Sequence, residues 1–91
     1  MKSDPKTLLK KNPKLNHLDA VKVESHVQRA KDGGYLNTVM LQGYDVPFKY
    51  WRNEQYKDLK GARVNLTYYP TTESVAGMDL EIMKVVRIRR S

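Results

Sequence analysis

A turn that follows a run of alternating residues constrains this chain more than any other feature. Residues 20–31 alternate between apolar and polar side chains, and this period of two is typical of a half-buried β-strand. The run leads into Asp32-Gly33-Gly34, where the glycines favour a tight hairpin turn because such turns need positive φ angles. The sequence therefore predicts an early β-hairpin within a mainly β fold.

Four later segments extend this pattern. Each is rich in apolar, β-branched or aromatic residues, and together they predict the remaining strands at 35–42, 45–52, 62–69 and 79–90. The small and polar residues of 70–78 predict a loop before the last strand.

Alternation also predicts which side chains face the core. In the first strand the side expected to face inwards carries Val21, Val23, Ser25 and Val27. In the fourth strand it carries Ala62, Val64, Leu66 and Tyr68.

Residues 53–60 break the alternation and predict a short helix. Asn53 suits an N-cap, Glu54 suits a first helical turn, and Gly61 suits a C-terminal stop. Three strands, one helix and two strands form the order of the OB-fold, a five-stranded Greek-key barrel. An SH3-like barrel and an open antiparallel sheet crossed by a helix are the alternatives. Because 91 residues leave no room for two cores, residues 17–91 are expected to form one such domain.

The basic residues are concentrated at the two ends of the chain. The net charge is +7; residues 1–16 carry five lysines against one acid, and residues 84–91 carry four basic residues and no acid. Residues 17–83 carry eight basic residues against nine acidic ones. This distribution predicts a polyanionic partner and a basic N-terminal arm over 1–16, in which Asp4-Pro5 would suit the start of a short helix.

Other features exclude several classes of protein. No cysteine is present, which excludes disulfides and thiolate metal sites, and no apolar run reaches the roughly 20 residues that cross a bilayer. Without a signal-peptide pattern either, we expect a cytoplasmic protein that does not contact a membrane. His17 and His26 lack further ligands, and no acid is tied to a nucleophile, so neither a metal, a cofactor nor an enzymatic activity is expected.

Four features carry a family resemblance. They are the long first strand, the Gly-Gly-Tyr-Leu that opens the second strand, Val46-Pro47-Phe48 in the third, and the apolar final strand over 80–88. In these features the chain resembles the small OB-fold single-stranded-DNA-binding proteins of filamentous phages and mobile elements. The resemblance implies that Tyr35 stacks on bases and that the protein forms a homodimer. The basic arm and the distinct helix depart from the pattern of that family.

Rings and cations together predict the binding residues. Proteins that bind single strands place flat rings against bases and cations against phosphates. Phe48, Tyr50 and Tyr68 are expected in the core. The predicted nucleic-acid-binding residues are Tyr35, Lys49, Trp51, Arg52, Arg63, Tyr69, Arg87 and Arg89.

The expected function is binding of single-stranded DNA, or RNA, with little sequence preference. One rival is a phage- or plasmid-encoded adaptor whose exposed rings dock on a host or replication protein. Another is a binder of structured RNA that relies on the charged ends alone.

Overall fold

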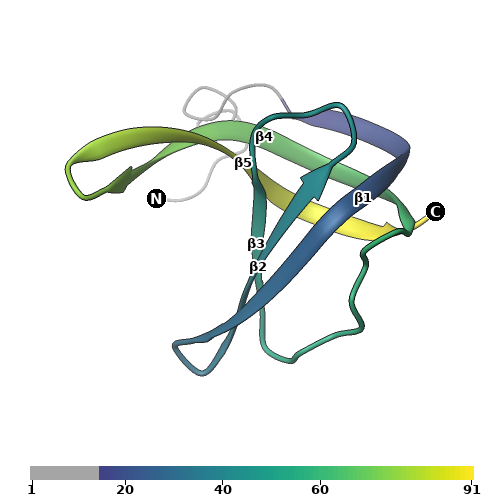
Figure 1. The fold of residues 1–91 in the computed structure, drawn as a ribbon, viewed down its shortest axis with the longest axis horizontal. Coiled ribbons are helices and arrows are strands. Elements are labelled where there is room, and N and C mark those ends of the chain that lie inside the picture. Colours follow the sequence, from purple (N-terminus) through teal and green to yellow (C-terminus); the bar gives the residue numbers. More distant parts are fainter. Residues whose placement is uncertain (1–14) are drawn as a thin grey trace, which may run out of the picture.

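The computed structural model describes residues 15–91 and shows a mainly β protein, as predicted (Figure 1). Its strands are β1 (Asn16–Lys31), β2 (Gly34–Leu41), β3 (Phe48–Arg52), β4 (Arg63–Val75) and β5 (Met78–Arg90). Residues 15–91 contain no helix, and hence none that could cross a membrane. The expected N-terminal arm and its short helix lie, except for Leu15 and Asn16, outside the described residues.

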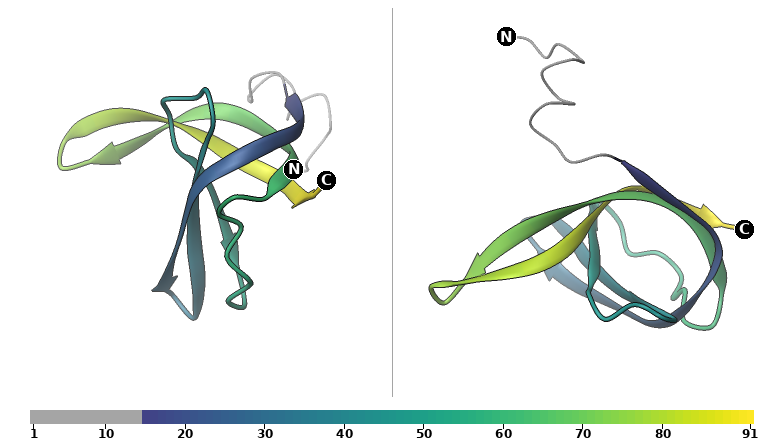
Figure 2. Two further views of the ribbon diagram at one scale, coloured as in Figure 1. Left: turned by 45° about the vertical axis from the view of Figure 1, so that its right-hand side comes forward. Right: turned by 90° about the horizontal axis from the view of Figure 1, so that it is seen from above.

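The five strands belong to one sheet that closes on itself in the order β1-β2-β3-β5-β4. All neighbouring strands run antiparallel except β3 and β5, which are parallel and pair only at Phe48 with Met83 and at Lys49 with Lys84. Viewed from above, the strands curve around a common interior (Figure 2). Beyond this short contact β3 and β5 are not paired, and Leu59 of the segment 53–62 packs against the core there.

The interior is filled by apolar side chains from all five strands. Phe48 is fully buried and makes edge-to-face contacts with Tyr44 and Tyr68, at centroid distances of 5.7 and 5.0 Å. The expected core positions of Phe48 and Tyr50 are confirmed, whereas Tyr68 is partly buried and packs against the buried cluster. The buried cluster consists of Val23, Val39, Leu41, Phe48, Tyr50, Val64, Leu66 and Val85.

A β-bulge in β1 exchanges the inward-facing and outward-facing residues in the part of the strand that follows Val23. The pairing with β2 shifts register between Val23 and Ser25, so the alternation is out of phase afterwards. Val27, predicted to face inwards, is 51% exposed, whereas the side chain of His26 is only 1% exposed. The assignment of Ser25 and Val27 to the core side was therefore wrong.

The predicted helix over 53–60 was also wrong, because its backbone is hydrogen-bonded to β1 side chains instead. The Gln28 amide donates to the Tyr56 carbonyl (2.6 Å) and accepts from the Tyr56 N–H (2.9 Å). The Leu59 N–H donates to His26 Nδ1 (2.9 Å), and the other ring nitrogen of His26 lies 2.7 Å from Asn37 Oδ1. So short a helix is marginal alone, and side-chain partners from a neighbouring strand outweigh its internal bonds.

The predicted loop over 70–78 is instead a hairpin. β4 continues to Val75, and Ala76 and Gly77 form a two-residue turn with φ angles of 52° and 80°. Positive φ at both central residues gives the turn whose twist matches that of the strands. The β4–β5 hairpin extends beyond the other strands (Figure 1).

Candidate nucleic-acid interface

The outward surface of the sheet gathers rings and cations from four strands. Registered partners on neighbouring strands share a face, and successive residues point to opposite faces. One transverse row runs Tyr69–Lys84–Lys49–Thr38, and the next pairs Trp51 with Leu36 and Leu36 with Arg29. We call this surface the Trp51 face and define it by Arg29, Lys31, Leu36, Lys49, Trp51, Tyr69 and Lys84.

Trp51 is seated on the β1–β2 hairpin. The indole lies against the backbone of Gly34. A Cβ added to this glycine would lie 2.2 Å from the indole Cζ2 and 2.5 Å from the Arg52 carbonyl oxygen. The indole Nε1–H also points at the Lys31 carbonyl, at 3.4 Å. The absence of a side chain at Gly34 therefore lets the ring rest against the backbone. Trp51 nevertheless stays 43% exposed, so its outer surface can accept a base.

Three lysines surround one carboxylate beside this ring. Lys49 Nζ lies 2.7 Å from Glu73 Oε1 and ties β3 to the β4–β5 hairpin. This hydrogen bond, together with the charges of Lys49, Lys31 and Lys84, holds the pKa of Glu73 below its ordinary value of 4.5. Glu73 borders the Trp51 face and carries one negative charge against these three lysines, so the cluster keeps a positive excess.

If the Trp51 face binds an oligonucleotide, Glu73→Gln should strengthen that binding several-fold at low salt, because it removes the acid that competes with phosphate for Lys49. The same change should cost about 0.5 kcal/mol of stability, as for exposed ion pairs. A lowered carboxyl pKa stabilises the fold above pH 4.5, and this contribution is lost as the pH falls through the lowered value. Urea unfolding at pH 7 and pH 3 should therefore show a smaller difference in stability between the variant and wild type at pH 3 than at pH 7.

Known proteins give no guide to this surface. No family model, curated protein or solved structure matches the chain.

The structure brings Lys49, Trp51 and Tyr69 together but places Tyr35 and Arg52 on the other side of the sheet. Tyr35 pairs with Arg52, next to Trp51 in sequence, so both point away from the Trp51 face. The Arg52 guanidinium carbon lies 5.2 Å from the centre of the Tyr50 ring, and Tyr35 is half-buried. Tyr35 is therefore not part of one continuous path with Trp51.

The remaining predicted residues lie towards the C-terminal end of β5 and the start of β4. Arg87 and Arg89 point outwards and line a shallow depression with His17 and Asn65. Arg63 donates from Nη1 to the carbonyl of Ala20 (2.9 Å), a residue at a bulge with a φ of 53°. Asn65 Oδ1 accepts from the Ala20 N–H, so Arg63 already has a structural partner at this bulge.

Sequence reasoning missed Arg29, Lys31, Lys84 and Glu73. The β1 bulge moves Arg29 and Lys31 onto the outward side, and a one-residue shift of this kind leaves no clear mark in the alternation. Lys84 meets Lys49 only through the parallel β3–β5 contact between distant segments. Glu73 was assigned to a loop, although its position opposite Leu80 in a regular hairpin fixes the face on which it lies.

Proposed function

We propose that the protein binds single-stranded DNA with little sequence preference, through the Trp51 face. The observation that carries the proposal is a half-exposed tryptophan, seated on a glycine, on the same outward surface as four cationic side chains. A flat ring offers stacking to any base, worth on the order of 1–3 kcal/mol each, and the cations attract successive phosphates. Tyr69 supplies a second ring, next to Lys84 in the row that runs from Tyr69 through Lys84 to Lys49.

The strand arrangement supports the same interpretation. β4 lies beside β1, followed by β2 and β3, and this spatial order is that of a Greek key. We propose that the domain is an OB-fold without its usual helix. OB-folds bind oligonucleotides on the face of strands 2 and 3, between the loops that join strands 1 to 2 and 4 to 5. Under this proposal the Trp51 face, which includes Leu36 of β2 and both Lys49 and Trp51 of β3, corresponds to that binding face.

Trp51 is the only tryptophan, so its fluorescence reports directly on the proposed site. Titration with oligo-dT should quench this emission, and about four phosphate contacts would give a slope near −3 for log K against log salt. Trp51→Ala, followed by anisotropy of a labelled oligonucleotide, should weaken binding about tenfold. The same titration with oligo-rU compares DNA with RNA.

Lys60→Gln provides the control, because Lys60 is an exposed cation of the segment 53–62 that lies outside the Trp51 face, beside Lys22 and Gly61. It should leave affinity unchanged. Failure of wild-type protein to bind oligo-dT at about 20 mM salt, where electrostatic attraction is strongest, would contradict the proposed function. Binding that persists unchanged in Trp51→Ala would retain the function but remove the stacking role.

A protein–protein adaptor is the second candidate, and the β4–β5 hairpin is the feature that favours it. Val75, Met78 and Leu80 are 46%, 63% and 44% exposed, and the register places them on one side of the projecting ribbon. Exposed apolar surface of this kind can mark an interface. An adaptor would keep its partner in a pull-down after nuclease treatment, whereas a partner held through DNA would be lost.

A further inference from the structure

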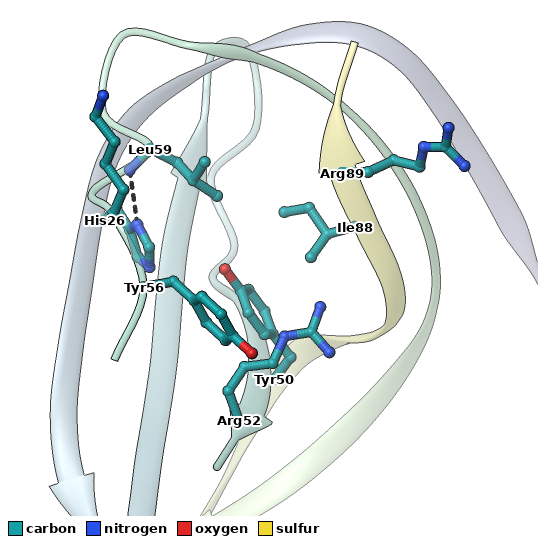
Figure 3. Close-up of a pocket in the computed structure, with 8 residues that line it drawn as sticks. His26, Tyr50, Arg52, Tyr56, Leu59, Ile88 and Arg89 are labelled. Carbon is teal, nitrogen blue, oxygen red and sulfur yellow. Dashed lines mark hydrogen bonds between the residues drawn. The ribbon is translucent and has the colours of Figure 1, made fainter. Parts of the chain in front are cut away.

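The end of the interior where β3 and β5 are not paired contains a pocket separate from the Trp51 face. Its volume is about 270 Å³, and residues of β1, β3, the segment 53–62 and β5 line it. Figure 3 shows the Tyr50 and Tyr56 rings near one another, the Arg52 side chain beside them, and Leu59 and Ile88 on the far side. We call it the Tyr50 pocket; its lining is His26, Tyr50, Arg52, Tyr56, Lys57, Leu59, Ile88 and Arg89.

The pocket wall is held in place by hydrogen bonds within the protein. The backbone of Tyr56 makes two hydrogen bonds to the Gln28 side chain, and His26 Nδ1 accepts a hydrogen bond from the Leu59 N–H. The Arg52 guanidinium is positioned beside the Tyr50 ring. Because the wall is preformed, a ligand would not have to order the segment 53–62, and binding would avoid that entropic cost.

Charge, shape and size together indicate the ligand. Three lining residues are cationic, namely Arg52, Lys57 and Arg89, and among the described lining residues none is acidic. The carboxylate of Asp58 lies 3.7 Å from His26 Nδ1 but does not line the pocket. A phosphate monoester, which carries a charge between about −1.5 and −2 at pH 7, suits this excess better than a singly charged carboxylate. The volume and the two tyrosine rings suit one planar ring system.

We propose that the Tyr50 pocket binds one nucleotide unit, with its base against the Tyr50 and Tyr56 rings and its phosphate at Arg52. Arg89 lies at the rim, where its side chain is directed away from the rings (Figure 3). The unit is either a free mononucleotide or the phosphorylated end of a strand, since both present the same chemistry. This proposal does not depend on the Trp51 face.

Isothermal titration of the full chain with thymidine 5′-monophosphate tests the proposal. The expected dissociation constant is below about 1 mM, and both thymidine and inorganic phosphate should bind at least about tenfold more weakly. Arg52→Gln and Tyr56→Ala should each weaken binding of the monophosphate about tenfold. Tyr56 is 55% exposed, so its replacement should leave the thermal midpoint nearly unchanged and keep the test interpretable.

Arg87→Gln is the matched control, because Arg87 is an exposed arginine of β5 outside this pocket. It should bind the monophosphate like wild type, and so should Trp51→Ala. A strand end is the source if a 5′-phosphorylated dT8 binds about tenfold better than its 5′-hydroxyl form; a free mononucleotide is the source if the two bind equally. The proposal would be overturned if the wild-type protein did not bind thymidine 5′-monophosphate, or if it bound inorganic phosphate with the same affinity. It would also be overturned if Arg87→Gln lost as much affinity for the monophosphate as Arg52→Gln.

Discussion

Phe48→Ala is expected to cost about 3–5 kcal/mol of stability, the largest effect of any change considered for this chain. Phe48 has no exposed surface and lies where β2, β3 and β5 meet, paired with Val39 and Met83. Its removal leaves the Tyr44 and Tyr68 rings without their edge-to-face partner. Because a domain of this size has a total stability of only about 5–15 kcal/mol, the variant should be partly unfolded at 37 °C.

Thermal unfolding followed by circular dichroism measures this effect, and the midpoint should fall by at least about 12 °C. Tyr56→Ala removes an aromatic ring of similar size from the exposed segment 53–62 and should lower the midpoint by far less. If the two variants melted at the same temperature, Phe48 would not be the centre of the core.

The parts of the fold that depend on local chemistry could be predicted from the sequence. Asp32-Gly33 marks the first hairpin because a positive φ is needed there, and the structure has φ angles of 50° and 79° at these two residues. Alternation in the fourth strand placed Val64 and Leu66 in the core, where both are fully buried or nearly so. By contrast, Ala76-Gly77 gives a turn of the same kind without the usual Asn or Asp, so the second hairpin was missed.

What could not be predicted depends on contacts between distant segments. The segment 53–60 has capping residues suited to a helix, yet Gln28 and His26 from β1 take its backbone groups. Tyr35 and Trp51 were both predicted to bind, but only the β2–β3 register shows that they point to opposite faces. The cluster of Lys31, Lys49 and Lys84 around Glu73 likewise depends on a bulge and a parallel contact.

Gly34→Ala is expected to cost about 3 kcal/mol, near the upper end for one added methyl group in a packed site. The new Cβ would meet the Trp51 ring at 2.2 Å and the Arg52 carbonyl oxygen at 2.5 Å, and the second of these is backbone that cannot swing aside. The indole should therefore move away from the β1–β2 hairpin. Its emission maximum should shift, and if the Trp51 face binds single strands, affinity for oligo-dT should fall about tenfold.

A double-mutant cycle separates the ring from the backbone in this effect. In a Trp51→Ala background the clash with the ring is gone while that with the Arg52 carbonyl remains, so Gly34→Ala should cost less there than in wild type. The difference in unfolding free energy between the two backgrounds measures how firmly the indole is seated. Equal costs in both backgrounds would mean that Gly34 does not position Trp51. The position of the Trp51 ring would then not depend on its contact with the β1–β2 hairpin. The structure would give no reason to expect a rigidly held ring on which a base could stack.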